Sequence, residues 1–249
     1  MEFAVPGFAQ TYELLASIAT VIRYDPRNTG LSTRGVEDVS IGACVRDLDA
    51  VRRHYQLESA ALLFPMAWAR VAVEYASAHP ECVTAIISPY PQLYPETGPG
   101  RGRFNDLSRA AADLGPEVYA SIRSVLAVGL EAHENAAWLA KYTLHGADFD
   151  DLLRGSAAMG AHDASAAAAN VRCPTLLLHR RLPRYAFGPA TEPMLREHRA
   201  SIARLSASIP GAESTMLDGS SIWYFGDDEM TARMMAFLRR VFADKVVAA

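Results

Sequence analysis

The spacing of hydrophobic positions changes several times along the chain, and each spacing predicts a type of element. Short runs rich in aliphatic and β-branched residues alternate with stretches in which apolar positions recur at helical intervals. Short apolar runs are typical of strands buried on both faces, whereas the helical interval is typical of amphipathic helices. Regular alternation of the two predicts an α/β fold, in which a mostly parallel sheet is flanked by helices.

The pattern assigns strands to about six short runs. The expected strands are Phe3–Val5, Thr20–Tyr24, Ala60–Phe64, Val83–Ser88, Thr175–His179 and Ser214–Leu217. The expected helices around them are Gln10–Ala19, Val36–Tyr55, Trp68–Ala78, Glu192–Ser208 and Glu229–Phe242. The order of these elements favours one core built from both ends of the chain.

The middle of the chain interrupts this alternation. The stretch PYPQLYPETGPGRGR, which begins at Pro89, is rich in Pro and Gly and is typical of a linker. After it, Asp106–Leu153 is helical by pattern, and Ala157–Asn170 consists mostly of small residues. We therefore expect a core made of residues 1–90 and 171–249, with residues 91–170 inserted as a helical cap.

Composition and charge exclude several classes of function. The 249 residues carry a net charge of −4, so no basic field favours nucleic acid or anionic lipid. No apolar run approaches the roughly 20 residues of a membrane-spanning helix. The first residues lack the features of a signal peptide. These observations predict a cytoplasmic protein with neither a nucleic-acid nor a membrane partner.

Motifs for metals and cofactors are also missing from the sequence. The cysteines, Cys44, Cys82 and Cys173, are odd in number and widely spaced, which favours three reduced thiols over disulfides or a metal site. No histidines stand at metal-binding intervals, and no glycine-rich nucleotide motif follows a strand. We expect neither a metal nor a cofactor.

Several segments, in this order along the chain, resemble the α/β-hydrolase family. They are VIRYDPRNTGLS (Val21–Ser32), similar to the family's D-x-R-G-x-G-x-S turn with Asn28 in place of a glycine; Cys44–Val51, similar to the following helix; AHPECV (Ala78–Val83); RCPTLLLH (Arg172–His179); and PGA from Pro210. The resemblance covers essentially the whole chain. It implies an α/β-hydrolase-like, mostly parallel sheet of about six strands with a helical cap.

The same resemblance implies an exposed sheet edge. AVPGF (Ala4–Phe8) looks like the third strand of the family sheet and the oxyanion loop after it, so the first two strands of the family have no counterpart. Val21–Tyr24 would then form an uncovered edge, which is a surface for pairing with another chain. A homodimer through this edge is one expectation; protection of the edge by the helix at Gln10–Ala19 is the other.

The segments that should carry a catalytic triad lack its residues. The family's G-x-S-x-G elbow corresponds here to Phe64–Trp68, with Met66 at the serine position. The acid loop corresponds to His179–Phe187, which contains no carboxylate, and the family histidine would fall within Ser220–Ile222. A methionine thioether has no proton to lose, so the resemblance argues against Ser–His–acid hydrolysis. The bulk around Met66 implies an elbow that is either reshaped or strained.

The family's pocket, at the carboxyl ends of the strands under the cap, is therefore expected to be an apolar and aromatic ligand site. Its candidate substrate-binding residues are Phe8, Pro65, Met66, Trp68, Tyr94, Trp138, Tyr142, Arg184, Ser221 and Trp223. The leading acid–base candidate is Tyr224, followed by Tyr185 and Tyr90. Alternatively, Phe64, Met66 and Trp68 simply fill space in the core.

These expectations leave more than one function open. The first is a non-hydrolytic enzyme, such as a cyclase that acts by cyclisation, conjugate addition, dehydration or cycloaddition on a bulky apolar intermediate. Triad-less relatives of the family among bacterial natural-product proteins suggest this possibility. The second is a non-catalytic small-molecule binder, and the third is a partner-binding pseudoenzyme. Hydrolysis by other residues is the most distant.

Overall fold

The computed structural model describes residues 7–95, 99–128, 133–181, 191–218 and 226–247, with the backbone alone for residues 99–105 and 244–247. Within these ranges the sheet has four parallel strands in the order β1-β2-β3-β4. The strands are β1 (Ala60–Leu63), β2 (Val83–Pro89), β3 (Thr175–Arg180) and β4 (Glu213–Leu217). The expected strand at Phe3–Val5 lies outside the described residues.

The prediction of a strand at Thr20–Tyr24 is wrong, because the structure has no strand there. The alternating apolar residues of this segment fit a strand equally well, but no ladder of hydrogen bonds joins it to β1. The edge of the described sheet is therefore β1 itself. The homodimer expected through Val21–Tyr24 stays a prediction, without the strand on which it was based.

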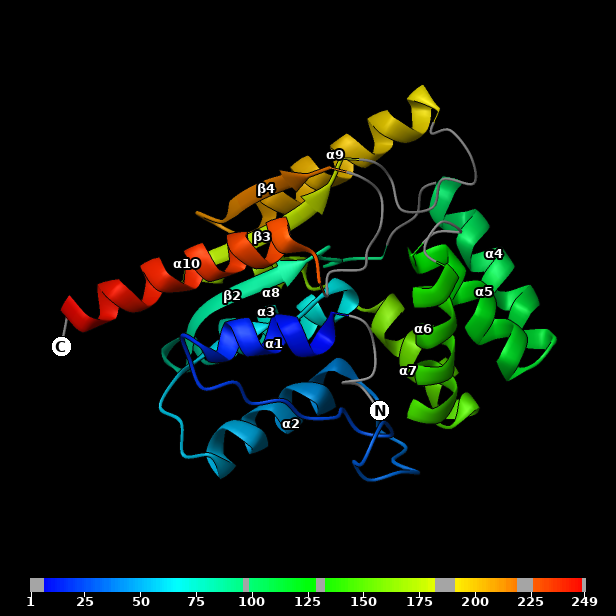
Figure 1. The fold of residues 1–249 in the computed structure, drawn as a ribbon, viewed down its shortest axis with the longest axis horizontal. Coiled ribbons are helices and arrows are strands. Elements are labelled where there is room, and N and C mark those ends of the chain that lie inside the picture. Colours follow the sequence, from blue (N-terminus) through cyan, green and yellow to red (C-terminus); the bar gives the residue numbers. More distant parts are fainter. Residues whose placement is uncertain (1–6, 96–98, 129–132, 182–190, 219–225, 248–249) are drawn as a thin grey trace.

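Helices cover both faces of the sheet (Figure 1). On one face lie α1 (Phe8–Ala16) and α10 (Asp228–Val247). On the other lie α2 (Ile41–His54), α3 (Ala69–Ala78), the short α8 (Ser165–Ala168) and α9 (Glu192–Ser208). The helices expected from sequence are thus present, with α9 at the bounds that the pattern gave.

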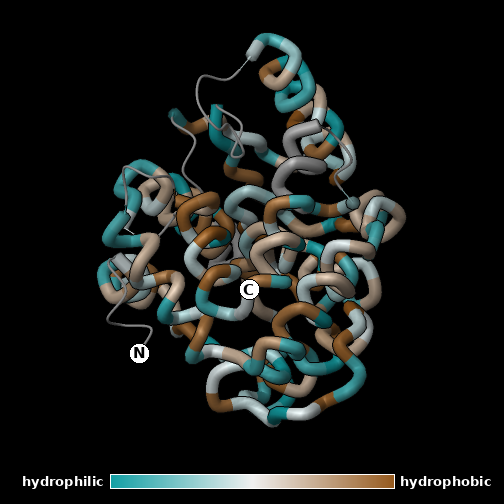
Figure 2. The backbone as a smooth tube through the Cα atoms, turned by 90° about the vertical axis from the view of Figure 1, so that its right-hand side faces the viewer, coloured by the Kyte–Doolittle hydropathy of each residue, from teal (hydrophilic) through white to brown (hydrophobic). Residues whose placement is uncertain are grey.

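The strand sequences explain this two-sided packing, because successive side chains of a strand point to opposite faces. Ile86 and Leu177 join the hydrophobic cluster that includes α2, α3 and α9. Ile87 and Leu178 join the cluster formed with α1 and α10. In Figure 2 the main group of hydrophobic segments lies in the centre of the view.

Four helices between β2 and β3 form the cap. They are α4 (Pro99–Asp113), α5 (Pro116–Val128), α6 (His133–Gly146) and α7 (Phe149–Ala161). They stand at the end toward which the strand arrows point in Figure 1, so the cap covers the carboxyl ends of the strands. The helix α4 begins inside the stretch that the sequence assigned to a linker. His162, just after α7, bonds Glu74 of α3 at 2.6 Å and ties the cap to the core.

Among the described residues, no helix is long and apolar enough to cross a membrane.

Candidate functional site

The turn after β1 holds Met66 in a strained conformation. Met66 has a φ of +50°, a value that costs a residue with a side chain roughly 1–3 kcal/mol. The turn leads through a 3-10 segment, Met66–Trp68, into α3. Of the two possibilities left by the sequence, a reshaped or a strained elbow, the structure has the strained one.

Backbone hydrogen bonds hold this turn from both sides. Phe64 donates its N–H to the carbonyl of Ile87 at 3.0 Å, and its own carbonyl accepts the Ser88 hydroxyl at 2.7 Å. After the turn, Gln92 donates its N–H to the Met66 carbonyl at 3.1 Å. The neighbouring strand β2 therefore fixes the position at which Met66 leaves the sheet.

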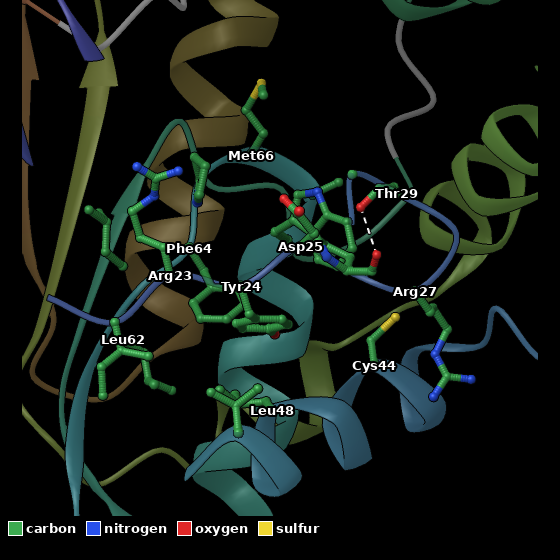
Figure 3. A pocket seen from close by; sticks show the side chains of 18 of the residues that line it. Arg23, Tyr24, Asp25, Arg27, Thr29, Cys44, Leu48, Leu62, Phe64 and Met66 are labelled. Atoms are coloured by element: carbon green, nitrogen blue, oxygen red, sulfur yellow. Dashed lines mark hydrogen bonds between the residues drawn. The ribbon is translucent and has the colours of Figure 1, made fainter. Parts of the chain in front are cut away.

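A cavity of about 1250 Å³ lies beside this turn. It separates the edge of β1 from the segment of residues 19–31, and α6 and α7 of the cap contribute to its lining. Its volume exceeds the roughly 300–1,000 Å³ of a typical small-molecule pocket. Figure 3 shows Met66, Phe64 and Leu62 on one side, with Tyr24 and Asp25 of the facing segment. The elbow therefore opens onto a space large enough for a bulky ligand.

The wall formed by β1 and the elbow is apolar. Leu62, Phe64, Met66 and Trp68 all line the cavity. Tyr24 lines it as well and lies toward α2, against the buried hydrophobic cluster. Burial raises the pKa of Tyr24, and the nearby Cys44 and Asp47 add to this shift. Its phenol thus stays neutral and behaves as a largely apolar ring with one hydroxyl.

The lining also includes polar side chains, among them Tyr12 of α1, Arg23, Asp25 and Tyr142 of α6. The Arg23 guanidinium lies 4.3 Å from the centroid of the Tyr12 ring. Asp25 accepts the N–H of Leu31 at 2.9 Å.

Burial raises the pKa of Tyr142, the charge of Asp25 raises it further, and Arg23 lowers it. Burial raises the pKa of Tyr12 to about 12, with a contribution from Tyr142. Tyr142 is thus the residue of this group whose pKa responds to both Arg23 and Asp25.

The loop after Asp25 is fixed by side chains that the sequence pattern singled out. Arg27 donates two hydrogen bonds of 2.7 Å to the carboxylate of Asp47. Asn28 stands at a φ of +62°, a conformation that asparagine tolerates better than most residues. Its amide donates to the Val36 carbonyl at 2.7 Å and accepts the Val36 N–H at 2.8 Å. Asn28 therefore replaces the expected glycine and also anchors the loop.

Gly30, in the same loop, has no room for a side chain. A Cβ at this position would come within 2.0 Å of the Asp25 carboxylate. The N–H of Gly30 donates to the carbonyl of Gly146, at the end of α6, at 2.7 Å. This bond joins the cavity wall to the cap.

A second polar group lies at the carboxyl ends of the strands. Arg180, at the end of β3, pairs with Asp227, and its guanidinium carbon lies 5.7 Å from the ring centroid of Tyr90. Tyr90 follows β2 with a φ of +52°. Burial raises the pKa of Tyr90, and the charge of Arg180 partly offsets this. Tyr90 is therefore a neutral, buried phenol, but it does not line the cavity.

The structure brings together only part of the site expected from sequence. Pro65, Met66, Trp68 and Tyr142 line the cavity. Tyr185, Tyr224, Arg184, Ser221 and Trp223 lie outside the described residues.

Three of the expected residues lie elsewhere. Phe8 is buried, and the centroid of its ring lies 6.1 Å from that of Tyr12 in an edge-to-face arrangement. Tyr94 is buried under the Arg204 guanidinium at 3.7 Å, and its hydroxyl donates to the Ser201 carbonyl. Trp138 is 37% exposed on α6. None of the three lines the cavity, and the residue that α6 presents to it is Tyr142 rather than Trp138.

Sequence reasoning missed Tyr12, Arg23, Tyr24 and Asp25 as site residues. It placed Arg23 and Tyr24 inside a strand and Asp25 in the turn that follows. The available signal was the charge of Arg23 within an otherwise apolar run, which is unusual for a strand buried on both faces.

In the described part of the chain, no three His, Cys, Asp or Glu side chains are grouped as metal ligands would be. His179 is buried in β3, and burial lowers its pKa to about 4, so its imidazole is neutral near pH 7. It does not line the cavity.

Comparison with solved structures finds the same architecture in several hydrolases. An esterase from Exiguobacterium antarcticum superposes with a TM-score of 0.76 at 15% identity, covering 92% of this chain and 85% of its own. An enol-lactonase from Burkholderia xenovorans LB400 gives 0.73 at 17% identity, covering 96% and 86%. A thermophilic esterase from Thermogutta terrifontis gives 0.72 at 16% identity, covering 95% and 86%. The chain has the α/β-hydrolase fold.

At these identities the likeness is one of fold alone. No protein-family model matches the sequence, and no curated protein sequence matches it either. In the α/β-hydrolase fold, the strained strand-to-helix turn presents the nucleophile. In this chain, the residue at that turn is Met66.

Proposed function

We propose that this chain is a non-hydrolytic enzyme with the α/β-hydrolase fold. Its substrate would be a bulky, largely apolar small molecule, and the reaction a cyclisation, conjugate addition, dehydration or cycloaddition, such as those of bacterial natural-product biosynthesis. One observation carries the proposal: Met66 keeps the strained φ of the nucleophile turn while its side chain lines a cavity of about 1250 Å³. A thioether there can shape a ligand but cannot attack it.

The combination of apolar and charged residues in the cavity lining supports catalysis over passive storage. A large apolar wall orients a flexible molecule, and orientation alone supplies up to roughly 7–11 kcal/mol in favourable reactions. In the same lining, Arg23, Asp25 and Tyr142 combine a cation, an anion and a neutral phenol. Such a set can hydrogen-bond to a developing enolate or transfer a proton.

A non-catalytic ligand binder is the second candidate, and the size of the cavity favours it equally. The partner-binding alternative has less support, because a protein that uses only its surface needs no cavity at the elbow. Binding assays alone cannot separate the first two candidates, so the decisive experiment measures turnover.

The test incubates the protein with N-acetylcysteamine thioesters of polyenes and of β-keto chains. Mass spectrometry detects products of unchanged mass or with water lost, and a thiol reagent detects hydrolysis. We expect new products without thiol release. Tyr142→Phe should slow their formation about tenfold or more, whereas Tyr55→Phe, on an exposed ring, should not. Tyr224→Phe tests the leading candidate from sequence.

Each other outcome has a definite reading. Thiol release above the uncatalysed rate contradicts the proposal and restores hydrolysis. Tight binding of the thioesters without any product contradicts catalysis and supports the ligand binder. Absence of both binding and turnover across the panel contradicts both.

A further inference from the structure

We propose that the unpaired edge of β1 and the cavity beside it bind an extended apolar peptide, which adds to the sheet as a further strand. This inference deepens the proposed function by naming the class of substrate, and it rests on that function for the role of the cavity as a ligand site.

The backbone of Leu63 points away from the rest of the sheet. Phe64 donates its N–H to the Ile87 carbonyl at 3.0 Å, and Leu63 is the residue that stands opposite Ile87 in the parallel register. In a parallel pair, residues that bond the neighbouring strand alternate with residues whose N–H and C=O groups point to the other side. Leu63 is of the second kind, and no hydrogen bond joins its N–H or C=O to another described residue.

The cavity lies where the next strand of the sheet would be. Leu63 lines it together with the rest of β1, and the space separates them from residues 19–31. Leu48 of α2 lines the cavity from one face of the sheet, whereas Leu15 of α1 and Leu238 of α10 line it from the other face (Figure 1). The cavity therefore continues the layer of the sheet between the same helices that cover β1.

An occupant of this space has to satisfy backbone polar groups and also be apolar. An extended peptide supplies N–H and C=O groups at the spacing of a strand, and main-chain hydrogen bonds give affinity when a peptide adds to a sheet edge. Successive side chains of a strand point to opposite faces. Because apolar residues line the cavity from both faces, all side chains of the peptide should be apolar.

The first test measures the affinity for acetyl-Val-Leu-Val-Leu-Val-amide, which carries a polyethylene-glycol tail for solubility, by titration calorimetry. Two isomers of this peptide each have three N-methyl groups. In the alternate isomer, methyl groups on the first, third and fifth residues block one edge of the strand and leave the other able to pair. In the contiguous isomer, methyl groups on the second, third and fourth residues block both edges of the centre.

We expect the alternate isomer to bind within about threefold of the unmethylated peptide. The contiguous isomer should bind at least about tenfold more weakly, because its centre has no N–H to donate to the Leu63 carbonyl. The two isomers have the same number of methyl groups and the same side chains. Their difference therefore reports backbone pairing and not apolar contact.

The second test removes the donor from the protein. Proline is tolerated in an edge strand where the missing N–H faces away from the neighbouring strand, so Leu63→Pro should fold. This variant should bind the unmethylated peptide about tenfold more weakly than Leu63→Ala, which loses the side chain but keeps the N–H. Circular dichroism verifies that both variants are folded.

Amide exchange provides a readout that needs no variant. In the parent protein, the unmethylated peptide and the alternate isomer should each slow hydrogen exchange of the Leu63 amide at least about tenfold, measured by NMR. The Phe64 amide, which already bonds Ile87, serves as the internal control and should change less.

Several results would overturn the added strand. Equal affinity of the two isomers would do so, as would unchanged exchange of the Leu63 amide in the complex. Peptide binding that appears only after deletion of residues 1–6 would make the chain itself the occupant of the edge. A dimer that dissociates when the peptide binds would make a second copy the occupant. Either result contradicts a site for a separate peptide ligand.

The outcomes also separate this inference from the proposed function. Turnover of the thioesters without binding of any peptide overturns the peptide site and leaves the enzyme. Binding of the peptide with the expected preference between isomers, but without turnover of peptide or thioester, supports the peptide site and contradicts the enzyme.

Discussion

The backbone carbonyl of Met66 accepts the N–H of Gln92 at 3.1 Å, so the end of β1 is tied directly to the chain that leaves β2. Met66 and Tyr90, which follow these neighbouring strands, both adopt a positive φ. Strain of this kind persists only where the surroundings impose it. The hydrogen bonds that join β1 to β2 thus support a strained turn with a methionine at its centre.

A β-branched residue at this turn should be especially unfavourable. We expect Met66→Val to lower the free energy of unfolding by about 1–2 kcal/mol more than Met66→Leu, because β-branched residues rarely adopt a positive φ. Urea denaturation measures the difference. Met216→Val and Met216→Leu, within β4, form the matched control pair, for which valine should not be the worse residue. Equal stability of Met66→Val and Met66→Leu would contradict the strain.

The Arg27–Asp47 pair should dominate the stability of the loop that carries Asn28. Asp47→Ala removes two hydrogen bonds to a mostly buried guanidinium, so we expect a loss of about 2–3 kcal/mol. Asp38→Ala removes the exposed pair with Arg46 and should cost much less in unfolding experiments, because solvent screens exposed pairs. Similar losses for the two variants would argue against an anchoring role for Asp47.

His179 should make the protein less stable in mild acid. Its pKa is about 4 in the folded chain, against 6.5 for an unperturbed histidine, and burial is the main cause. Between these values the unfolded chain takes up a proton that the folded chain excludes, so stability falls as the pH falls from about 6.5 to 4. We expect roughly 2 kcal/mol to be lost over this window.

The check on His179 compares the pH dependence of unfolding in the parent and in His179→Leu. The variant should show a shallower decline between pH 6.5 and 4, because its buried side chain no longer titrates. An unchanged decline would assign the acid sensitivity to other groups.

Of the two tryptophans in the described residues, only Trp68 should report the ligand by its fluorescence. Trp68 lines the cavity, whereas Trp138 is exposed on α6 beside Lys141. An apolar ligand should therefore change the emission of the parent and of Trp138→Phe equally, and the change should be largely lost in Trp68→Phe. If the change is instead lost in Trp138→Phe, the ligand binds at the cap surface.

The fold was largely predictable because its strands and helices differ clearly in hydrophobic period. The pattern located β2 and α9 closely, since each combines a strong period with clear ends. It failed at Thr20–Tyr24, because an extended segment and a paired strand share the same alternation and only the partner distinguishes them. The sequence could not show that this segment is separated from β1 by a cavity and is not joined to it by a ladder of hydrogen bonds.

The site was less predictable for a related reason. Met66 could be recognised from its place in the elbow, and Tyr142 from its place in the cap. Arg23 and Asp25 acquire their importance only through Tyr12 and Tyr142, which are distant in sequence and contribute from α1 and α6. Conversely, Tyr94 and Trp138 were plausible by type, but only the three-dimensional packing shows that they do not line the cavity.

The Gly30 N–H donates to the Gly146 carbonyl, so hydrogen exchange at the Gly30 amide reports movement of the cap relative to the core. Its hydrogen can exchange with solvent only after the loop and the end of α6 separate. Deuterium uptake at Gly30 would therefore follow the separation of cap and core directly, and its slowing would show that an occupied cavity holds them together.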